Sequence, residues 1–143
     1  MKENLSSFSA SNLPKVPTGN PKDFRVKTCL HSVSYSGLWR GQAFLTVDEF
    51  VSKASELGYD GVELGTKRPH ASLLDYDDAA RKKLRARFKE LDLDLVCLAG
   101  YNDFTAGIDN VGVPHVEIQS LYIGELARLA QDLGTNMVRI YTG

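Results

Sequence analysis

A short unit of apolar and polar positions occurs three times along the chain. Each copy contains the end of an amphipathic helix, a tight break and a short apolar strand, and the copies cover residues 56–65, 90–99 and 132–141. They align without gaps, with a leucine at each helix end and a valine in each strand. A helix-to-strand unit that recurs in this way predicts an α/β architecture with a parallel sheet.

The same periodicity predicts four strands and three helices in alternation. The strands are expected at residues 26–31, 61–65, 95–99 and 137–141. The helices are expected between Thr46 and Leu57, between Asp77 and Leu91, and from about Pro114 to Gly134. Thr46 and Glu49 have the spacing of a capping box, which predicts where the first helix begins.

Two architectures begin with this order of elements. One is the eight-stranded (β/α) barrel, for which about 250 residues are typical, and the other is a doubly wound sheet of the flavodoxin kind. Strands of a doubly wound sheet have helices on both faces and are almost continuously apolar. Here the apolar residues alternate with small or polar ones. The helix side is assigned Val62, Leu64, Val96, Leu98, Val138 and Ile140, and the other side Gly61, Glu63, Gly65, Cys97, Ala99, Met137, Arg139 and Tyr141. The alternation favours the first half, about four strands, of a TIM barrel.

Composition limits the possible partners of the chain. It has 17 Lys and Arg against 18 Asp and Glu, so neither nucleic acid nor an anionic membrane is predicted as a partner. No apolar run approaches the roughly 18 residues of a membrane span, and the N-terminus lacks the features of a secretory signal, so a cytoplasmic protein is expected. The six basic residues within 81–89 predict a solvated outer helix face. Cys29 and Cys97 lie in apolar strand segments and predict two reduced, packed thiols.

The domain boundary follows from the same patterns. Residues 1–22 are rich in Ser, Asn and Pro and show no periodicity, so a flexible tail is expected there. Residues 23–143 are about one domain long and form the expected partial barrel.

Polar and aromatic side chains follow each predicted strand, where such barrels place their active sites. His31 and Trp39 follow the first strand, residues 66–70 the second, residues 101–104 the third and Tyr141 the fourth. Histidine can transfer a proton near neutral pH, and Lys or Arg beside it can bind an anion or a sugar hydroxyl. Each of these residues also has a structural interpretation, as a core histidine, a loop anchor or a solvated turn residue.

Glu63 and Arg139 form a separate pair. Both are predicted on the inner face, on the second and fourth strands, and alternate strands of a barrel share layers. A buried structural ion pair is the favoured interpretation. Catalytic use of Glu63 is disfavoured because the residue lies in the middle of its strand.

Three stretches resemble the sugar phosphate isomerase/epimerase family, the xylose-isomerase-like TIM barrels. They are GYDGVELGTKRPHAS, LAGYNDF and LARLAQDLGTNMVRIYTG, and the resemblance spans residues 24–143. It implies an enzyme that interconverts aldoses and ketoses, or epimerises sugars, by proton transfer next to a carbonyl. It also implies a divalent metal (Mn, Mg or Zn) for the full-length family.

The resemblance covers only the front half of such a barrel. Family metal ligands come mostly from strands five to eight, so we expect no metal ligand and assign no catalytic residue in this chain. What carries over is a set of candidate contacts to a sugar or sugar phosphate: His31, Trp39, Arg68, His70 and Asn102. The chain is therefore expected to be inactive alone and to self-associate or to need a C-terminal half.

Three alternatives stay open at this point. One is a non-catalytic half-barrel that binds a partner chain, and another is a self-contained flavodoxin-like binding domain. The third is a fragment of a type-2 apurinic-endonuclease-like barrel, in which His70 would correspond to a metal ligand. The absence of histidine from residues 100–104 weakens the endonuclease alternative.

Overall fold

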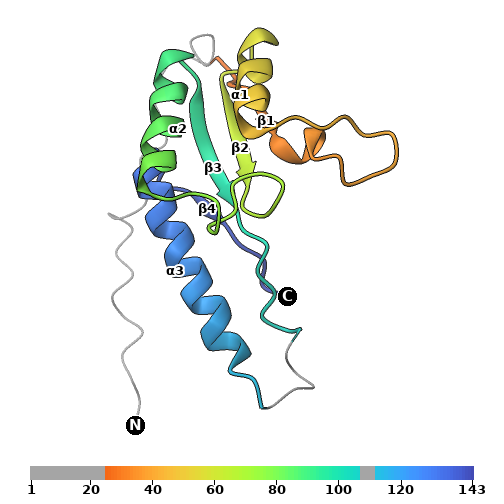
Figure 1. Ribbon diagram of the computed structural model, residues 1–143, viewed down its shortest axis with the longest axis vertical. Coiled ribbons are helices and arrows are strands. Elements are labelled where there is room, and N and C mark those ends of the chain that lie inside the picture. The colour runs from red at the N-terminus through yellow and green to blue at the C-terminus, as the bar shows by residue number, and fades with distance from the viewer. Residues whose placement is uncertain (1–24, 107–111) are drawn as a thin grey trace.

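The computed structural model describes residues 25–106 and 112–143, so the expected tail at 1–22 lies outside the described residues. Strands and helices alternate in the described part of the chain (Figure 1). The elements are β1 (Cys29–His31), the 3-10 helix η3 (Ser32–Tyr35), α1 (Val47–Glu56), β2 (Gly61–Gly65), α2 (Asp78–Glu90), β3 (Asp94–Ala99), α3 (His115–Leu133) and β4 (Val138–Arg139). The strands form one parallel sheet in the order β1-β2-β3-β4. Consecutive order is that of a barrel and differs from the order of a flavodoxin-like sheet.

Local sequence signals set the helix ends. The Thr46 hydroxyl accepts from the Glu49 amide at 3.3 Å, and the Glu49 carboxylate accepts from the Thr46 amide at 2.8 Å, which is the expected capping box. These hydrogen bonds hold the pKa of Glu49 below its usual value. Asp77 caps α2 by accepting from the Ala80 amide, and Gly134 ends α3 in the left-handed conformation at φ 96°.

The hydrophobic core lies between the helices and one face of the sheet. Phe50, Val51 and Ala54 of α1 are fully buried, as are Val62 and Leu64 of β2. The same core includes these side chains from the later elements: Leu84, Phe88, Leu98, Leu129, Ala130 and Leu133. The opposite face of the sheet carries no helix among the described elements, as expected for part of an open barrel wall.

Only the second half of α3 packs on this core. Leu126, Leu129 and Leu133 are buried, whereas Ile118 and Leu121 near the start of the helix are exposed. Figure 1 shows α3 continuing past the end of the strands. None of the helices that the structure describes is long and apolar enough to cross a membrane.

The predicted alternation is wrong at one point of β3. Val62 pairs with Leu95 and Glu63 with Cys97, so the register shifts at Val96. Leu95 is buried, while Val96, assigned to the helix side, is 39 % exposed. A β-bulge sets two residues opposite one and shifts the faces of those around it, which a strict two-residue period cannot predict.

Other strand predictions need smaller corrections. β1 begins at Cys29 and β4 ends at Arg139, so Val26 and Ile140 lie outside the strands and are exposed. Both cysteines are free thiols, but Cys29 is exposed rather than packed. It lies at the open start of an edge strand, where no further strand covers it in the described structure.

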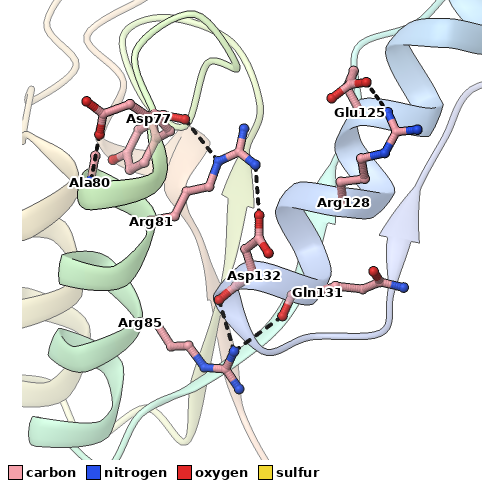
Figure 2. A network of polar contacts seen from close by, with 9 residues as sticks. Asp77, Ala80, Arg81, Arg85, Glu125, Arg128, Gln131 and Asp132 are labelled. Carbon is pink, nitrogen blue, oxygen red and sulfur yellow. Dashed lines mark hydrogen bonds and ion pairs between the residues drawn. The ribbon is translucent and has the colours of Figure 1, made fainter.

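Half of the basic residues of α2 bridge to neighbouring helices instead of forming only a solvated face. Arg81 pairs with Asp132 at 2.8 Å, and Arg85 donates to the carbonyls of Asp132 and Gln131 at the end of α3 (Figure 2). Arg87 donates to the Ser52 hydroxyl of α1 at 2.8 Å. The carbonyls in the last turn of a helix lack intrahelical partners and attract cations, which explains why Arg85 lies against the end of α3.

Candidate functional site

Three charged or titratable side chains from different strands meet on the helix-free face, toward the carboxyl end of the sheet. His31 and Arg139 are the last residues of β1 and β4, and Glu63 lies on β2. Arg139 Nε is 3.1 Å from Glu63 Oε1, and His31 Nε2 is 3.7 Å from Glu63 Oε2. The side chains of Glu63 and Arg139 are 21 % and 41 % exposed, so the pair forms but is not buried.

The local backbone holds the His31 ring in place. His31 caps η3, and its Nδ1 accepts from the Val33 amide at 2.9 Å. Burial lowers the pKa of His31; the carboxylate of Glu63 opposes this, and the charge of Arg139 adds to it. His31 is therefore neutral at pH 7, with its proton on Nε2, because Nδ1 already accepts.

Hydrogen bonds between neighbouring strand ends support this region. The Ser32 hydroxyl accepts from the Gly65 amide at 2.9 Å, which ties the end of β1 to β2. Thr66 Oγ1 donates to the Ala99 carbonyl at 2.8 Å and lies 2.9 Å from the Tyr122 hydroxyl. Buried polar groups with several partners hold one conformation, so the strand ends that present the site are fixed in position.

Two cations lie against aromatic rings beside this cluster. Lys67 Nζ is 4.1 Å from the centre of the Tyr101 ring, and Arg139 Cζ is 5.2 Å from that of Tyr141. The two rings are 6.4 Å apart, and burial raises the pKa of Tyr101. Lys67 and both tyrosines belong to the polar and aromatic residues expected directly after the strands, but none of the three was singled out as a substrate contact. Their contacts with each other and with Arg139 depend on side-chain packing, which their place after the strands does not predict.

His70 and Asn102, two of the predicted contacts, are buried in the structure. His70 Nε2 is 3.2 Å from the Leu45 carbonyl, and the ring stacks on Phe50 with centroids 6.2 Å apart. Burial lowers the pKa of His70. The Asn102 side chain donates to the Tyr141 carbonyl and accepts from the Tyr141 amide at 3.0 Å. Asn102 thereby extends the β3–β4 pairing by one step.

Arg68 and Trp39 make no contact with the cluster in the described structure. The Arg68 guanidinium binds both Asp75 carboxylate oxygens, at 2.8 and 2.6 Å, and this contact lowers the pKa of Asp75. Trp39 is 58 % exposed on the loop after η3. Of the five predicted contacts, the structure brings only His31 into contact with Glu63 and Arg139.

The cluster does not fit a divalent metal. In residues 25–106 and 112–143, no three His, Cys, Asp or Glu side chains are close enough to hold one. Glu63 is already bonded to a guanidinium, whose positive charge opposes a cation at the same carboxylate. His70, the residue compared with an endonuclease ligand, has its Nε2 against a backbone carbonyl.

A large hollow, about 920 Å³, lies elsewhere. Its lining includes Lys27, Asp60 and Asp94 near the amino ends of the strands, with Arg85 and Lys89 from α2. The amino end of a (β/α) barrel serves stability rather than chemistry, so size alone does not make this hollow the active site. A much smaller hollow, about 10 Å³, lies near the carboxyl ends, beside Lys67, His70 and Tyr101.

Comparison with known proteins finds one family and two relatives that the chain is similar to. Residues 51–143 match the family described as the xylose isomerase-like TIM barrel. The chain is 30 % identical over 105 residues to fructoselysine 3-epimerase of Escherichia coli O157:H7 and to that of Shigella flexneri. Each match covers 71 % of this chain but only 36 % of the relative, so the chain spans little more than a third of these relatives.

Proposed function

Because the chain belongs to the xylose isomerase-like TIM barrel family, we propose that it is the first part of a sugar isomerase or epimerase. The observation that carries this proposal is the His31–Glu63–Arg139 cluster on the open face of the sheet. Its distances of 3.1 and 3.7 Å join three strands at the end where barrels of this kind bind substrate. The 30 % identity to two fructoselysine 3-epimerases supports the same reaction class.

Isomerisation and epimerisation require removal of a proton next to a carbonyl. The reaction needs a base and a group that stabilises negative charge on the carbonyl oxygen. In our proposal His31 and Arg139 bind and orient oxygen atoms of the sugar, and Glu63 holds Arg139 in position. We propose that the base, and any divalent metal of the complete enzyme, come from later strands, because the described residues hold no metal-binding group of three.

We further propose that the 143-residue chain is not active alone. Edge strands β1 and β4 have unpaired backbone groups in the described structure, and such edges pair with other chains. Self-association or the remaining barrel strands would cover them. The two free thiols agree with a reducing compartment such as the cytoplasm. The alternative, a non-catalytic half-barrel that binds a partner chain, would use the same open face of the sheet. A measurement of turnover distinguishes this alternative from the enzyme.

The test is exchange of the carbon-bound proton in deuterated water. The 143-residue chain would be joined to the part of the E. coli epimerase that follows its matched region, and deuterium at C3 of fructoselysine would be followed by NMR. We expect exchange with the joined protein and none with the 143-residue chain alone. The control Glu90→Gln, on an exposed helix end, should retain the rate.

A folded joined protein with no exchange would contradict the proposed function and favour the non-catalytic alternative. Exchange by the isolated chain at the same rate would contradict its incompleteness.

A further inference from the structure

The contacts of His31 leave one of its ring nitrogens without a suitable partner. The Val33 amide can only donate, so Nδ1 must accept, and the single proton of the neutral ring is on Nε2. The nearest carboxylate oxygen, Glu63 Oε2, is 3.7 Å away, which is too long for a hydrogen bond. Among the described residues, the other contact of Nε2 is Arg139 Nη2 at 3.3 Å.

The contact between His31 and Arg139 joins two donors. A guanidinium has no acceptor, and Nε2 carries a proton, so neither nitrogen can accept from the other. Two N–H groups at 3.3 Å are favourable only when an acceptor atom lies beside both. An oxygen beside Glu63 Oε2 that accepts from both His31 and Arg139 would make this arrangement favourable.

A hydroxyl group meets this requirement. It has two lone pairs and one proton, so it can accept from Nε2 and Nη2 and donate to Glu63 Oε2. A carboxylate or phosphate oxygen would place negative charge against the Glu63 carboxylate. The cluster also has no net charge to attract an anion, since one carboxylate and one guanidinium offset each other and the imidazole is neutral.

We propose that His31, Glu63 and Arg139 form a subsite for a hydroxyl group of a neutral sugar or polyol. This inference rests on the proposed function and deepens it by naming the part of the substrate that the chain binds. Tyr141, whose ring lies 5.2 Å from Arg139 Cζ, offers an apolar face for the carbon-bound hydrogens of the same sugar. Closure of the sheet into a barrel leaves the carboxyl ends of the strands open, so association need not block the subsite.

Nitrogen-15 NMR of the histidine rings in the 143-residue chain tests the subsite directly. We expect His31 to have its proton on Nε2. Added D-fructose should shift the His31 Nε2 and Arg139 Nε signals to saturation, whereas sodium phosphate should not. A proton on Nδ1 would overturn the proposal. So would the absence of a saturable response to fructose, which would mean that water alone occupies the site, or a stronger response to phosphate.

Two variants sharpen this test. Arg139→Lys keeps the charge but removes the planar donor group, so fructose should bind about tenfold more weakly. The matched control Arg128→Lys, on the exposed face of α3 (Figure 2), should bind as the wild type does. Glu63→Gln leaves a net positive cluster, so a response to phosphate should appear. Equal affinity in Arg139→Lys, or no response of Glu63→Gln to phosphate, would contradict the subsite.

This experiment does not depend on turnover. Exchange by the joined protein without fructose binding here would refute the subsite, and with it the sugar-binding role of His31 and Arg139, but would leave the isomerase or epimerase reaction standing. Fructose binding by the 143-residue chain without exchange by the joined protein would support the subsite and contradict the proposed reaction.

Discussion

Glu63 lies in the middle of β2, and its carboxylate contacts side chains from two other strands. Alternation along the strands predicted that it would meet Arg139. The pair was also expected to be buried, but the Arg139 side chain is 41 % exposed. The reason is that the face of the sheet that carries both residues is open to solvent. A partly solvated pair contributes less to stability than a buried one.

The strength of this pair can be measured by a double-mutant cycle. We expect Glu63→Gln and Arg139→Met to destabilise the chain, with a coupling energy of about 1 kcal/mol because solvent screens the pair. Urea unfolding of the wild type, both single variants and the double variant gives this energy. A coupling near the 3–5 kcal/mol typical of breaking a buried pair would mean that the carboxyl end of this face, where the pair lies, is covered in solution, and would contradict the exposed pair.

Two histidines predict how stability depends on pH. Burial lowers the pKa of both His31 and His70 in the folded chain, while the unfolded value is about 6.5. At pH values between the lowered pKa of the folded chain and about 6.5, the unfolded chain binds more protons than the folded chain. The free energy of unfolding therefore rises with pH in this window and is lost as the pH falls through it.

We therefore expect lower urea midpoints at pH 5.5 than at pH 7.5. The carboxylates with lowered pKa, such as Asp60 and Asp75, titrate below this range. The variant His70→Gln should show a smaller pH dependence than the wild type. A midpoint that is constant or rises on acidification would contradict the assignment of neutral, buried histidines.

At the scale of elements, local signals predicted the helices better than the strands. The Thr46 capping box and Gly134 act within one turn of the chain, so the sequence around them is sufficient to locate helix ends. The bulge at Val96 depends on how β3 meets β2, and the contact of Arg85 depends on where α3 ends. Such contacts between elements leave no periodic signal along the chain.

In the candidate site, too, the positions of the strand residues were predicted correctly and those of the loop residues were not. Alternation and position after a strand predicted that His31, Glu63 and Arg139 share the inner face. The loop residues Arg68 and Trp39 were predicted as substrate contacts at the same end of the sheet, but Arg68 is turned to Asp75 by two hydrogen bonds and Trp39 is exposed on its loop. Loop conformation follows from such individual contacts, which hydrophobic periodicity does not record.

The contact between α2 and α3 gives a prediction at this scale. Arg85→Ala removes hydrogen bonds to the Gln131 and Asp132 carbonyls, so we expect a loss of about 1 kcal/mol in unfolding free energy. Lys82→Ala, on the same helix without such contacts among the described residues, should cost less than about 0.5 kcal/mol. Equal effects in urea unfolding would mean that Arg85 does not support the end of α3.

At the scale of the whole molecule, the described elements form a section of barrel wall with one face uncovered. Helices cover one face of the sheet, and the other carries both the polar cluster and exposed apolar side chains such as Val96. Both sheet edges, at β1 and β4, are unpaired among the described strands. Exposed edges and apolar faces promote association, so we expect that this chain does not remain a monomer.

Light scattering over a range of concentrations measures whether the chain associates. We expect a mass above the 15.8 kDa of one chain, and Val96→Lys on the open face should shift the mass toward the monomer. Leu121→Lys, on the exposed part of α3 away from the sheet, should leave the mass unchanged. A stable 15.8 kDa monomer at high concentration that unfolds cooperatively would contradict the open half-barrel.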